Sequence, residues 1–122
     1  MAAPNLVNVT SILGKTTGGN LNTTLTTSLL ANGASSNKLL KVNSIIIANV
    51  DGTNSADVTI SWHQGSSDYY IAKTVAVPAD STLVVIGKDS PIYLEENHTI
   101  RGGASANSDL DYIISYEELD DA

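Results

Sequence analysis

The 122-residue sequence contains no cysteine and no phenylalanine, and only six basic residues stand against thirteen acidic ones. Without cysteine the chain can form neither disulfides nor thiolate zinc sites, and it has no cysteine nucleophile. The net charge of −7 disfavours direct binding to nucleic acid or to anionic lipid. We therefore expect neither nucleic acid nor a membrane among its partners.

A membrane-spanning run and a secretion signal are also missing. The longest apolar run is much shorter than the roughly 20 residues that span a bilayer. Residues 1–7 contain no basic segment followed by a long apolar one, so we expect no signal peptide and folding in a cytoplasm. The length indicates one domain with one modest core, filled mainly by isoleucine, valine, leucine and alanine.

What the chain does contain is a succession of β-strand patterns between residues 38 and 116. Short turns rich in Gly, Asn, Asp and Ser separate them, and Asp51-Gly52 is a strong hairpin signal. About eight strands spaced eight to twelve residues apart predict an all-β fold, a single small β-sandwich or jelly-roll-like domain. The runs cover residues 41–50, 57–62, 69–77, 82–86, 92–94, 98–101 and 111–116.

Alternation within these runs predicts which side chains face the core. Two sets of alternate residues should each share one face: Val58, Ile60 and Trp62, and Tyr112, Ile114 and Tyr116. Residues 45–47 and 83–86 are apolar at every position, which is typical of central strands covered on both faces. We expect both runs to lie in the middle of a sheet.

The domain is expected to have three parts. Residues 1–37 are rich in Thr, Asn, Ser and Gly, and they form either an N-terminal arm or the first strands of the sandwich, with strands possible at 6–12 and 23–30. Residues 38–118 form the sandwich core. Residues 119–122 form an acidic tail, which is either solvated or docks on a basic patch of a partner with Leu119 as its apolar anchor.

No constellation of catalytic or metal-ligating residues is evident. The two histidines, His63 and His98, are expected to be surface or turn residues, because a zinc or nucleophilic site needs several such groups together. Residues 51–57 offer oxygen ligands but lack the EF-hand spacing, which favours a polar hairpin. Adjacent strand residues point to opposite faces, so the pairs Glu95-Glu96 and Glu117-Glu118 are no ready-made acid dyads. We expect no enzyme, metal or cofactor.

A resemblance adds to this interpretation. It rests on residues 41–54, 56–60, 71–83, 92–96, 100–107 and 114–118. In these segments the chain resembles small all-β virion proteins of tailed bacteriophages, notably phages of marine bacteria. Where such proteins usually continue with Gly-Asp after the Leu-Glu-Glu turn, this chain has Asn97-His98, which changes the turn chemistry more than the fold. The resemblance implies a structural protein of the virion, made in the host bacterial cytoplasm.

Three functions follow as hypotheses. The first is a capsid decoration or cement protein, a homotrimer on the outside of the phage head, where the N-terminal segment and one sandwich edge contact the major capsid protein or other virion proteins. The second is a neck, tail or fibre-attachment adaptor. The third, of another class, is a carbohydrate-binding sandwich for host adhesion.

Each hypothesis names its own residues. The expected partner contacts are Leu6, Val7, Val9, Ile12, Glu117, Glu118, Leu119 and Asp120. Carbohydrate binding would use Trp62, Tyr69 and Tyr70 as exposed aromatic side chains. The alternative for these three is that Trp62 lies in the core and the two tyrosines point to opposite faces.

Overall fold

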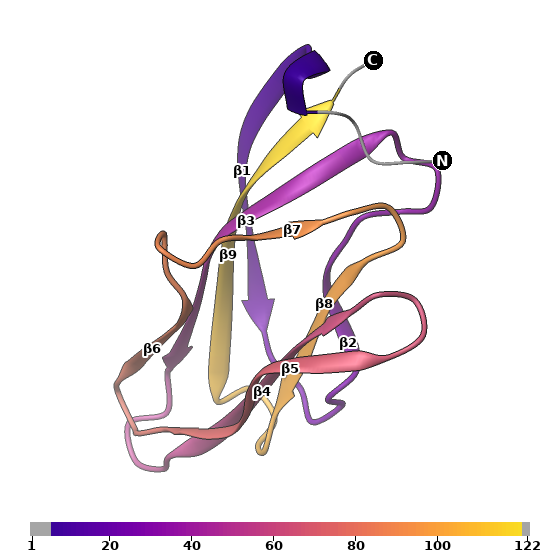
Figure 1. The fold of residues 1–122 in the computed structure, drawn as a ribbon. Coiled ribbons are helices and arrows are strands. Elements are labelled where there is room, and N and C mark those ends of the chain that lie inside the picture. Colours follow the sequence, from indigo (N-terminus) through magenta and orange to yellow (C-terminus); the bar gives the residue numbers. More distant parts are fainter. Residues whose placement is uncertain (1–5, 121–122) are drawn as a thin grey trace.

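A computed structural model describes residues 6–120, which form a short 3-10 helix and nine strands in two antiparallel sheets packed face to face (Figure 1). The all-β sandwich predicted from the sequence is confirmed. The elements are η1 (Leu6–Asn8), β1 (Ser11–Asn20), β2 (Thr27–Ala31), β3 (Lys38–Asn49), β4 (Ala56–His63), β5 (Asp68–Val77), β6 (Thr82–Ile86), β7 (Ile92–Leu94), β8 (Thr99–Ala104) and β9 (Leu110–Asp120).

The strands pair in a nested order. β1 pairs with β9, β2 with β8, β3 with β6 and β7, and β4 with β5, so the first half of the chain pairs with the second half in reverse. Sheet A has the order β1-β9-β3-β6 with β7 also on β3, and sheet B has the order β2-β8-β4-β5. This is the jelly-roll arrangement of two sheets. β6 and β7 share one of its eight positions, which accounts for the ninth strand.

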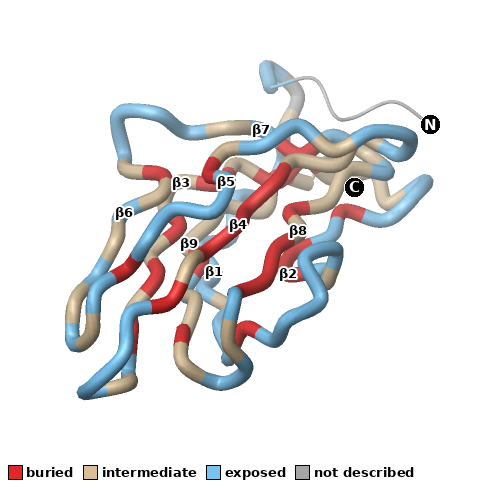
Figure 2. The backbone as a smooth tube through the Cα atoms, turned by 90° about the horizontal axis from the view of Figure 1, so that it is seen from below, coloured by how far each residue is buried: buried red, intermediate tan, exposed pale blue. Residues whose placement is uncertain are grey.

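The core lies between the two sheets and is almost entirely aliphatic. Ile45 and Ile47 of β3 face Val58 and Ile60 of β4, and all four side chains are fully buried. Figure 2 shows β4 buried along most of its length. The two predicted core-facing sets are confirmed in position, with Trp62, Tyr112 and Tyr116 packed at the margin of the core.

One of the two predicted central strands is wrong. β3 lies in the interior of sheet A, as expected, but β6 pairs only with β3 among the described residues and is therefore an edge strand. Its Val84 is 58% exposed. Ile46 lies opposite both Val84 and Ile113 on the outer face of the sheet, and Ile113 is also largely exposed. The apolar run of β6 thus comes from a row of apolar side chains exposed on the outer face of sheet A and not from a layer that covers this face.

The strand expected over residues 6–12 is also wrong in its bounds. Leu6–Asn8 is a turn of 3-10 helix, and β1 runs instead over Ser11–Asn20, through a segment rich in Gly and Thr. Almost every residue of β1 is exposed, so no alternation marked it in the sequence. Of the two alternatives for residues 1–37, the described part forms strands β1 and β2 of the sandwich.

The C-terminal strand is longer than expected. β9 extends to Asp120, so Leu119 and Asp120, which we expected in an acidic tail, lie in the ladder between β1 and β3. Residues 121 and 122 lie outside the described residues. The pairing on both sides explains why the strand continues past Tyr116, since each further residue gains hydrogen bonds from two neighbours.

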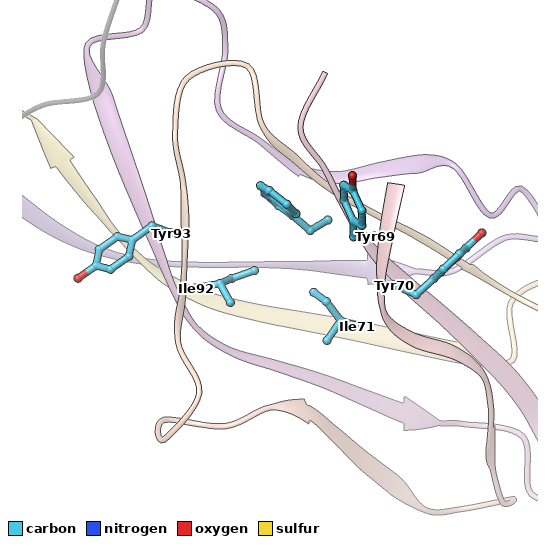
Figure 3. Close-up of a pocket in the computed structure, with 6 residues that line it drawn as sticks. Tyr69, Tyr70, Ile71, Ile92 and Tyr93 are labelled. Atoms are coloured by element: carbon cyan, nitrogen blue, oxygen red, sulfur yellow. The ribbon is translucent and has the colours of Figure 1, made fainter. Parts of the chain in front are cut away.

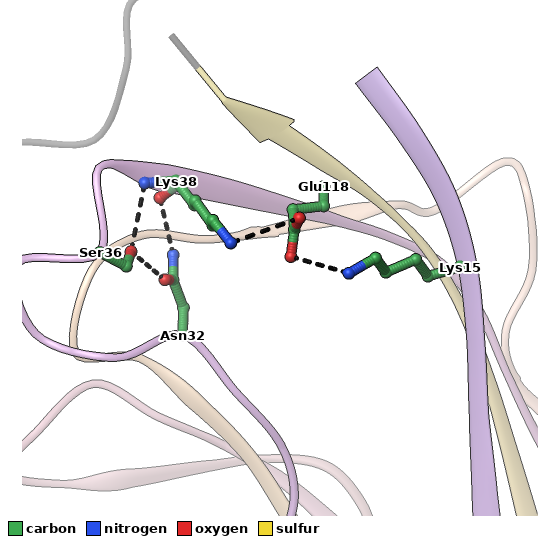
Figure 4. Close-up of polar contacts among 5 residues, drawn as sticks. All are labelled: Lys15, Asn32, Ser36, Lys38 and Glu118. Atoms are coloured by element: carbon green, nitrogen blue, oxygen red, sulfur yellow. Dashed lines mark hydrogen bonds and ion pairs between the residues drawn. The ribbon is translucent and has the colours of Figure 1, made fainter. Parts of the chain in front are cut away.

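Two buried asparagines tie the sheets together at loops. The Asn32 Nδ2 donates to the backbone oxygen of Lys38 at 2.8 Å, and Ser36 Oγ donates to the Asn32 Oδ1 (Figure 4). The same Nδ2 donates to the backbone oxygen of Leu94 at 2.8 Å. The Asn49 Nδ2 donates to the backbone oxygen of Val77 at 2.8 Å. Each amide therefore links a residue at the end of one sheet to a strand of the other, with its polar atoms satisfied inside the protein.

Candidate functional site

A cleft of about 330 Å³ opens where the edges of the two sheets meet, between β5 of sheet B and β7 of sheet A. Its lining is Trp62, Tyr69, Tyr70, Ile71, Ile92 and Tyr93. Figure 3 shows Ile71 and Ile92 pointing toward each other across the cleft, while Tyr70 and Tyr93 extend outward on opposite sides. We call this feature the aromatic cleft.

The ring of Trp62 is held in place by two aromatic neighbours. The centroid of Tyr69 lies 5.7 Å away with the planes tilted by 32°, and that of His98 lies 5.2 Å away in an edge-to-face arrangement. Both separations fall in the favourable range for aromatic pairs. The indole Nε1 is buried and has no hydrogen-bond acceptor. Trp62 is thus a fixed wall of the cleft with one unsatisfied donor.

The tyrosines of the cleft remain open to solvent. Tyr69, Tyr70 and Tyr93 are 56%, 54% and 42% exposed. Tyr69 packs on Trp62, whereas Tyr70 carries Lys73 over its ring with the ammonium 4.9 Å from the centroid. Trp62 therefore packs against the core and also lines the cleft, while Tyr69 and Tyr70 are exposed beside it.

A polar cluster that the sequence did not predict lies on the outer face of sheet B. Asp68 accepts a hydrogen bond from Ser61 Oγ at 3.2 Å, and its oxygens lie 3.2 Å from His63 Nδ1 and 3.4 Å from Arg101 Nη1. Ser61 bonds to the carboxylate and not to the imidazole, so a nucleophile activated by a base is not formed here. In the sequence, the only sign of this cluster was that Ser61 and His63 alternate with Trp62 and therefore lie on the other face of the strand.

Both histidines make contacts within the chain. His63 was expected to be a surface or turn residue, but its side chain is only 16% exposed because Asp68 lies opposite it in the ladder. His98 lies in the turn after β7, where its Nδ1 accepts the backbone N–H of Glu95 at 3.1 Å. Within residues 6–120 no group of three or more acidic or histidine side chains could hold a metal ion.

The segment over residues 51–57 is a turn closed by its own carboxylate. Asp51 accepts the backbone N–H of Thr53 at 2.9 Å, and this hydrogen bond lowers the pKa of the Asp51 carboxyl below its usual value. The part of the chain that the structure describes contains no helix long and apolar enough to cross a membrane.

The structure brings the two segments with expected partner contacts to one end of the sandwich. Ser11 lies opposite Asp120 and Ile12 opposite Leu119, although more than a hundred positions separate them in the sequence. η1 lies beside this end, where β1 begins and β9 ends (Figure 1). We call this end, formed by residues 6–13 and 117–120, the terminal end.

The expected contact residues differ in how accessible they are. Leu6, Val7 and Ile12 are 52%, 89% and 60% exposed, and Leu13, which we had not named, is 50% exposed. Val9, Glu117 and Asp120 are partly exposed, whereas Leu119 is buried.

Glu118, also an expected contact, is engaged within the chain. Its carboxylate lies 3.3 Å from the ammonium of Lys15 and 3.4 Å from that of Lys38, and its side chain is 13% exposed (Figure 4). The most exposed side chains of the terminal end are therefore apolar, and Glu118 of β9 joins β1 and β3 there through Lys15 and Lys38.

Neither a protein-family model nor a curated protein sequence matches this chain. The solved structures that are similar to it include two crystal structures of a pentameric capsid protein isolated from metagenomic phage sequences. One has a TM-score of 0.38 and 15% identity over 98% of this chain and 66% of its own. The other has a TM-score of 0.38 and 13% identity over 96% and 68%. The chain thus spans about two thirds of each protein's length.

Proposed function

We propose that this chain is a structural protein of a phage virion, specifically a decoration protein on the outside of the head lattice. The sequence resemblance over residues 38–118 supports the virion, and the jelly roll is an architecture used by viral capsid proteins, although a fold alone does not decide function. The observation that carries the proposal is the terminal end, where exposed apolar side chains lie on η1 and at the start of β1.

The terminal end has the chemistry of a docking surface. Leu6, Val7 and Ile12 present aliphatic side chains to solvent, and fully burying one such side chain contributes about 1.5–3 kcal/mol. Glu117 borders them and suits a basic patch on the lattice protein. Contacts of this size are weak singly, but several copies of the chain held together would engage several lattice sites at once.

Copy number in purified virions tests the proposal directly. With heads and tails separated, quantitative mass spectrometry should find the chain in heads at about hundreds of copies, the order expected for a protein that follows an icosahedral lattice. A handful of copies in tails would place it at the neck or tail as an adaptor instead. Absence from virions would refute both positions.

A pair of substitutions tests the contact surface. Leu6→Asp places a charge on the terminal end outside β1, and Val84→Asp places the same charge on the similarly exposed far edge of sheet A. Added to heads stripped of the protein, the first variant should bind at least about tenfold more weakly than wild type, because burying an unpaired carboxylate is costly. The second should bind as wild type does. Equal loss in both would exclude the terminal end as the contact.

The aromatic cleft supports a second candidate function, the binding of carbohydrate for host adhesion. Tyr69 and Tyr70 offer half-exposed rings beside the fixed ring of Trp62, and sugar rings pack their apolar faces on such surfaces. A glycan array should give signals that Tyr69→Ala abolishes and Val75→Ala, a change on the same strand outside the cleft, preserves. An array without signal would remove this candidate.

A further inference from the structure

Strand β1 has a long free edge. It pairs with β9 over ten residues without any shift of register, and within residues 6–120 β9 is its only neighbour. A strand with one neighbour leaves a row of backbone donors and acceptors available to another strand. The edge is therefore a template on which a further strand could form.

The ladder shows which backbone groups face that edge. The backbone N–H of Leu21 donates to the oxygen of Leu110 at 2.8 Å, so these two residues form a hydrogen-bonded pair. In an antiparallel ladder such pairs alternate with pairs whose backbone groups point away. The continuous register then assigns the outward N–H and C=O groups to Ile12, Gly14, Thr16, Gly18 and Asn20.

The edge lacks the features that usually prevent strand addition. β1 contains no proline and no bulge. Its one charged residue, Lys15, is paired with Glu118 and belongs to the alternate set that bonds to β9. Prolines, bulges and lysines are the common protections of an edge strand, so β1 is open to pairing.

The other edges of the molecule are poor matches for β1. β5 has the same length, but its register with β4 shifts twice and Thr74 has a φ of 54°. β2 has five residues and a register shift, and β6 and β7 have five and three residues. Among the described edges, the only one as long and regular as β1 is β1 of another molecule.

We propose that a second copy of the chain pairs antiparallel with β1 across a two-fold axis at Thr16, joining the two A sheets. Gly14 then lies opposite Gly18 of the second copy, and Ile12 opposite Asn20 of the second copy. Lys15 lies opposite Thr17 of the second copy, so the two lysines do not oppose each other. A two-fold contact of this kind closes a dimer and not the trimer expected from the sequence. The pairing does not depend on the virion function.

The mass in solution tests the pairing. The wild-type chain should show twice its mass of 12.7 kDa by light scattering, and dilution should shift it toward the monomer. Thr16→Pro removes one outward N–H without breaking a backbone hydrogen bond to β9, and it should give the monomer; the side-chain contact of Thr16 Oγ1 with Ser115 Oγ is lost equally in the alanine control. Thr16→Ala keeps the N–H and should give the dimer. Circular dichroism confirms that each variant is folded.

Three outcomes of that experiment would overturn the proposal. They are a monomeric wild type at every concentration, a mass three times that of the chain, and a dimer that a folded Thr16→Pro variant leaves unchanged. The last outcome would show that the contact lies elsewhere on the surface.

Cross-linking gives a second, independent measurement, since the natural chain has no cysteine. Two directly opposed strand residues have Cα atoms about 5.5 Å apart, within the range that a disulfide bridges. Thr16→Cys should therefore form a covalent dimer when copper phenanthroline is the oxidant. Ser115→Cys, one strand further in on the same face, would lie about 14 Å from its counterpart and should stay uncross-linked. Equal cross-linking of both, or of neither, would contradict the two-fold at Thr16.

Discussion

The two ten-residue edge strands of this sandwich, β1 and β5, differ in almost everything but length. β1 is regular, rich in Gly and Thr, and exposes its backbone. β5 is interrupted by register shifts on both sides of Ile60, and its Thr74 has a positive φ that a β-branched residue rarely adopts. The Thr74 N–H donates to Thr59 Oγ1 of the neighbouring strand β4 at 3.2 Å instead of facing the free edge.

The difference shows two ways in which an edge strand can act. Bulges make an edge unsuitable for pairing and re-aim its side chains. On β5 this leaves Tyr69 and Tyr70 beside Trp62 in the aromatic cleft, so that edge offers rings. The unbroken β1 offers hydrogen-bonding groups to another strand. We expect ligand recognition at the β5 edge and assembly at the β1 edge.

Substitution of Trp62 should have the largest effect on stability. Trp62→Ala removes the ring between Tyr69 and His98 and should lower the free energy of unfolding by about 3 kcal/mol, at the low end for a buried aromatic because the ring is partly exposed. Trp62→Phe keeps a ring and removes the unsatisfied N–H, so it should cost less than about 1.5 kcal/mol. Urea unfolding measures both, and equal costs would show that the cleft wall is not held by ring packing.

Proline substitutions at successive positions of β1 should distinguish the backbone groups that bond to β9 from those that face the free edge. The Thr17 N–H belongs to the set that bonds to β9, so Thr17→Pro should cost about 2–3 kcal/mol. The Thr16 N–H faces the free edge, and Thr16→Pro should cost less than about 1 kcal/mol. Thermal unfolding of the monomers compares the two, with the matching alanine variants as controls. The reverse order would mean that the alternation is assigned wrongly.

The glycines of β1 should respond in opposite directions to alanine. A Cβ at Gly14 meets nothing within 4 Å, so Gly14→Ala should stabilise the fold by about 0.5–1 kcal/mol through lower backbone entropy in the unfolded chain. A Cβ at Gly18 would lie 2.7 Å from the backbone oxygen of Tyr112, and Gly18→Ala should cost about 1 kcal/mol or more. Denaturant midpoints test the signs, and a gain at both positions would show that β1 shifts freely on β9.

Charge substitutions should have the smallest effects at both edges. Glu118→Gln removes the carboxylate shared by Lys15 and Lys38 and should cost about 0.5–1 kcal/mol at low salt, because both lysines are well exposed. Lys73→Met removes the ammonium over Tyr70 and should cost about 0.5 kcal/mol. Added salt should reduce the Glu118 effect. A salt-independent loss would mean that Glu118 acts through packing and not through its charge.

The sequence predicted well those strands that bury one face. Val58, Ile60 and Trp62 alternate with polar residues because one side of β4 meets the core, and Ile114 does the same in β9. Strands without a buried face left no such pattern. In the sequence, β1 was recognisable only as a segment rich in Gly and Thr. The apolar run of β6 suggested a central position in the sheet, whereas the strand lies at an edge.

The candidate sites divide in the same way. The aromatic residues of the cleft were recognisable in the sequence because Trp62, Tyr69 and Tyr70 lie close together along it. Tyr93 was not, because β7 reaches the cleft from the other sheet. The cluster around Asp68 likewise needs Arg101 from β8, which only the ladder with β4 brings near.

The sequence by itself determined the all-β class, the position of most strands and the core-facing side of those that bury one face, since burial imposes a two-residue period on the chain. Only the tertiary structure decided which strands become edges, which edge is regular, and that residues 6–13 and 117–120 meet at one end. Those choices depend on pairing between residues distant along the chain, and such pairing leaves no local periodic signal.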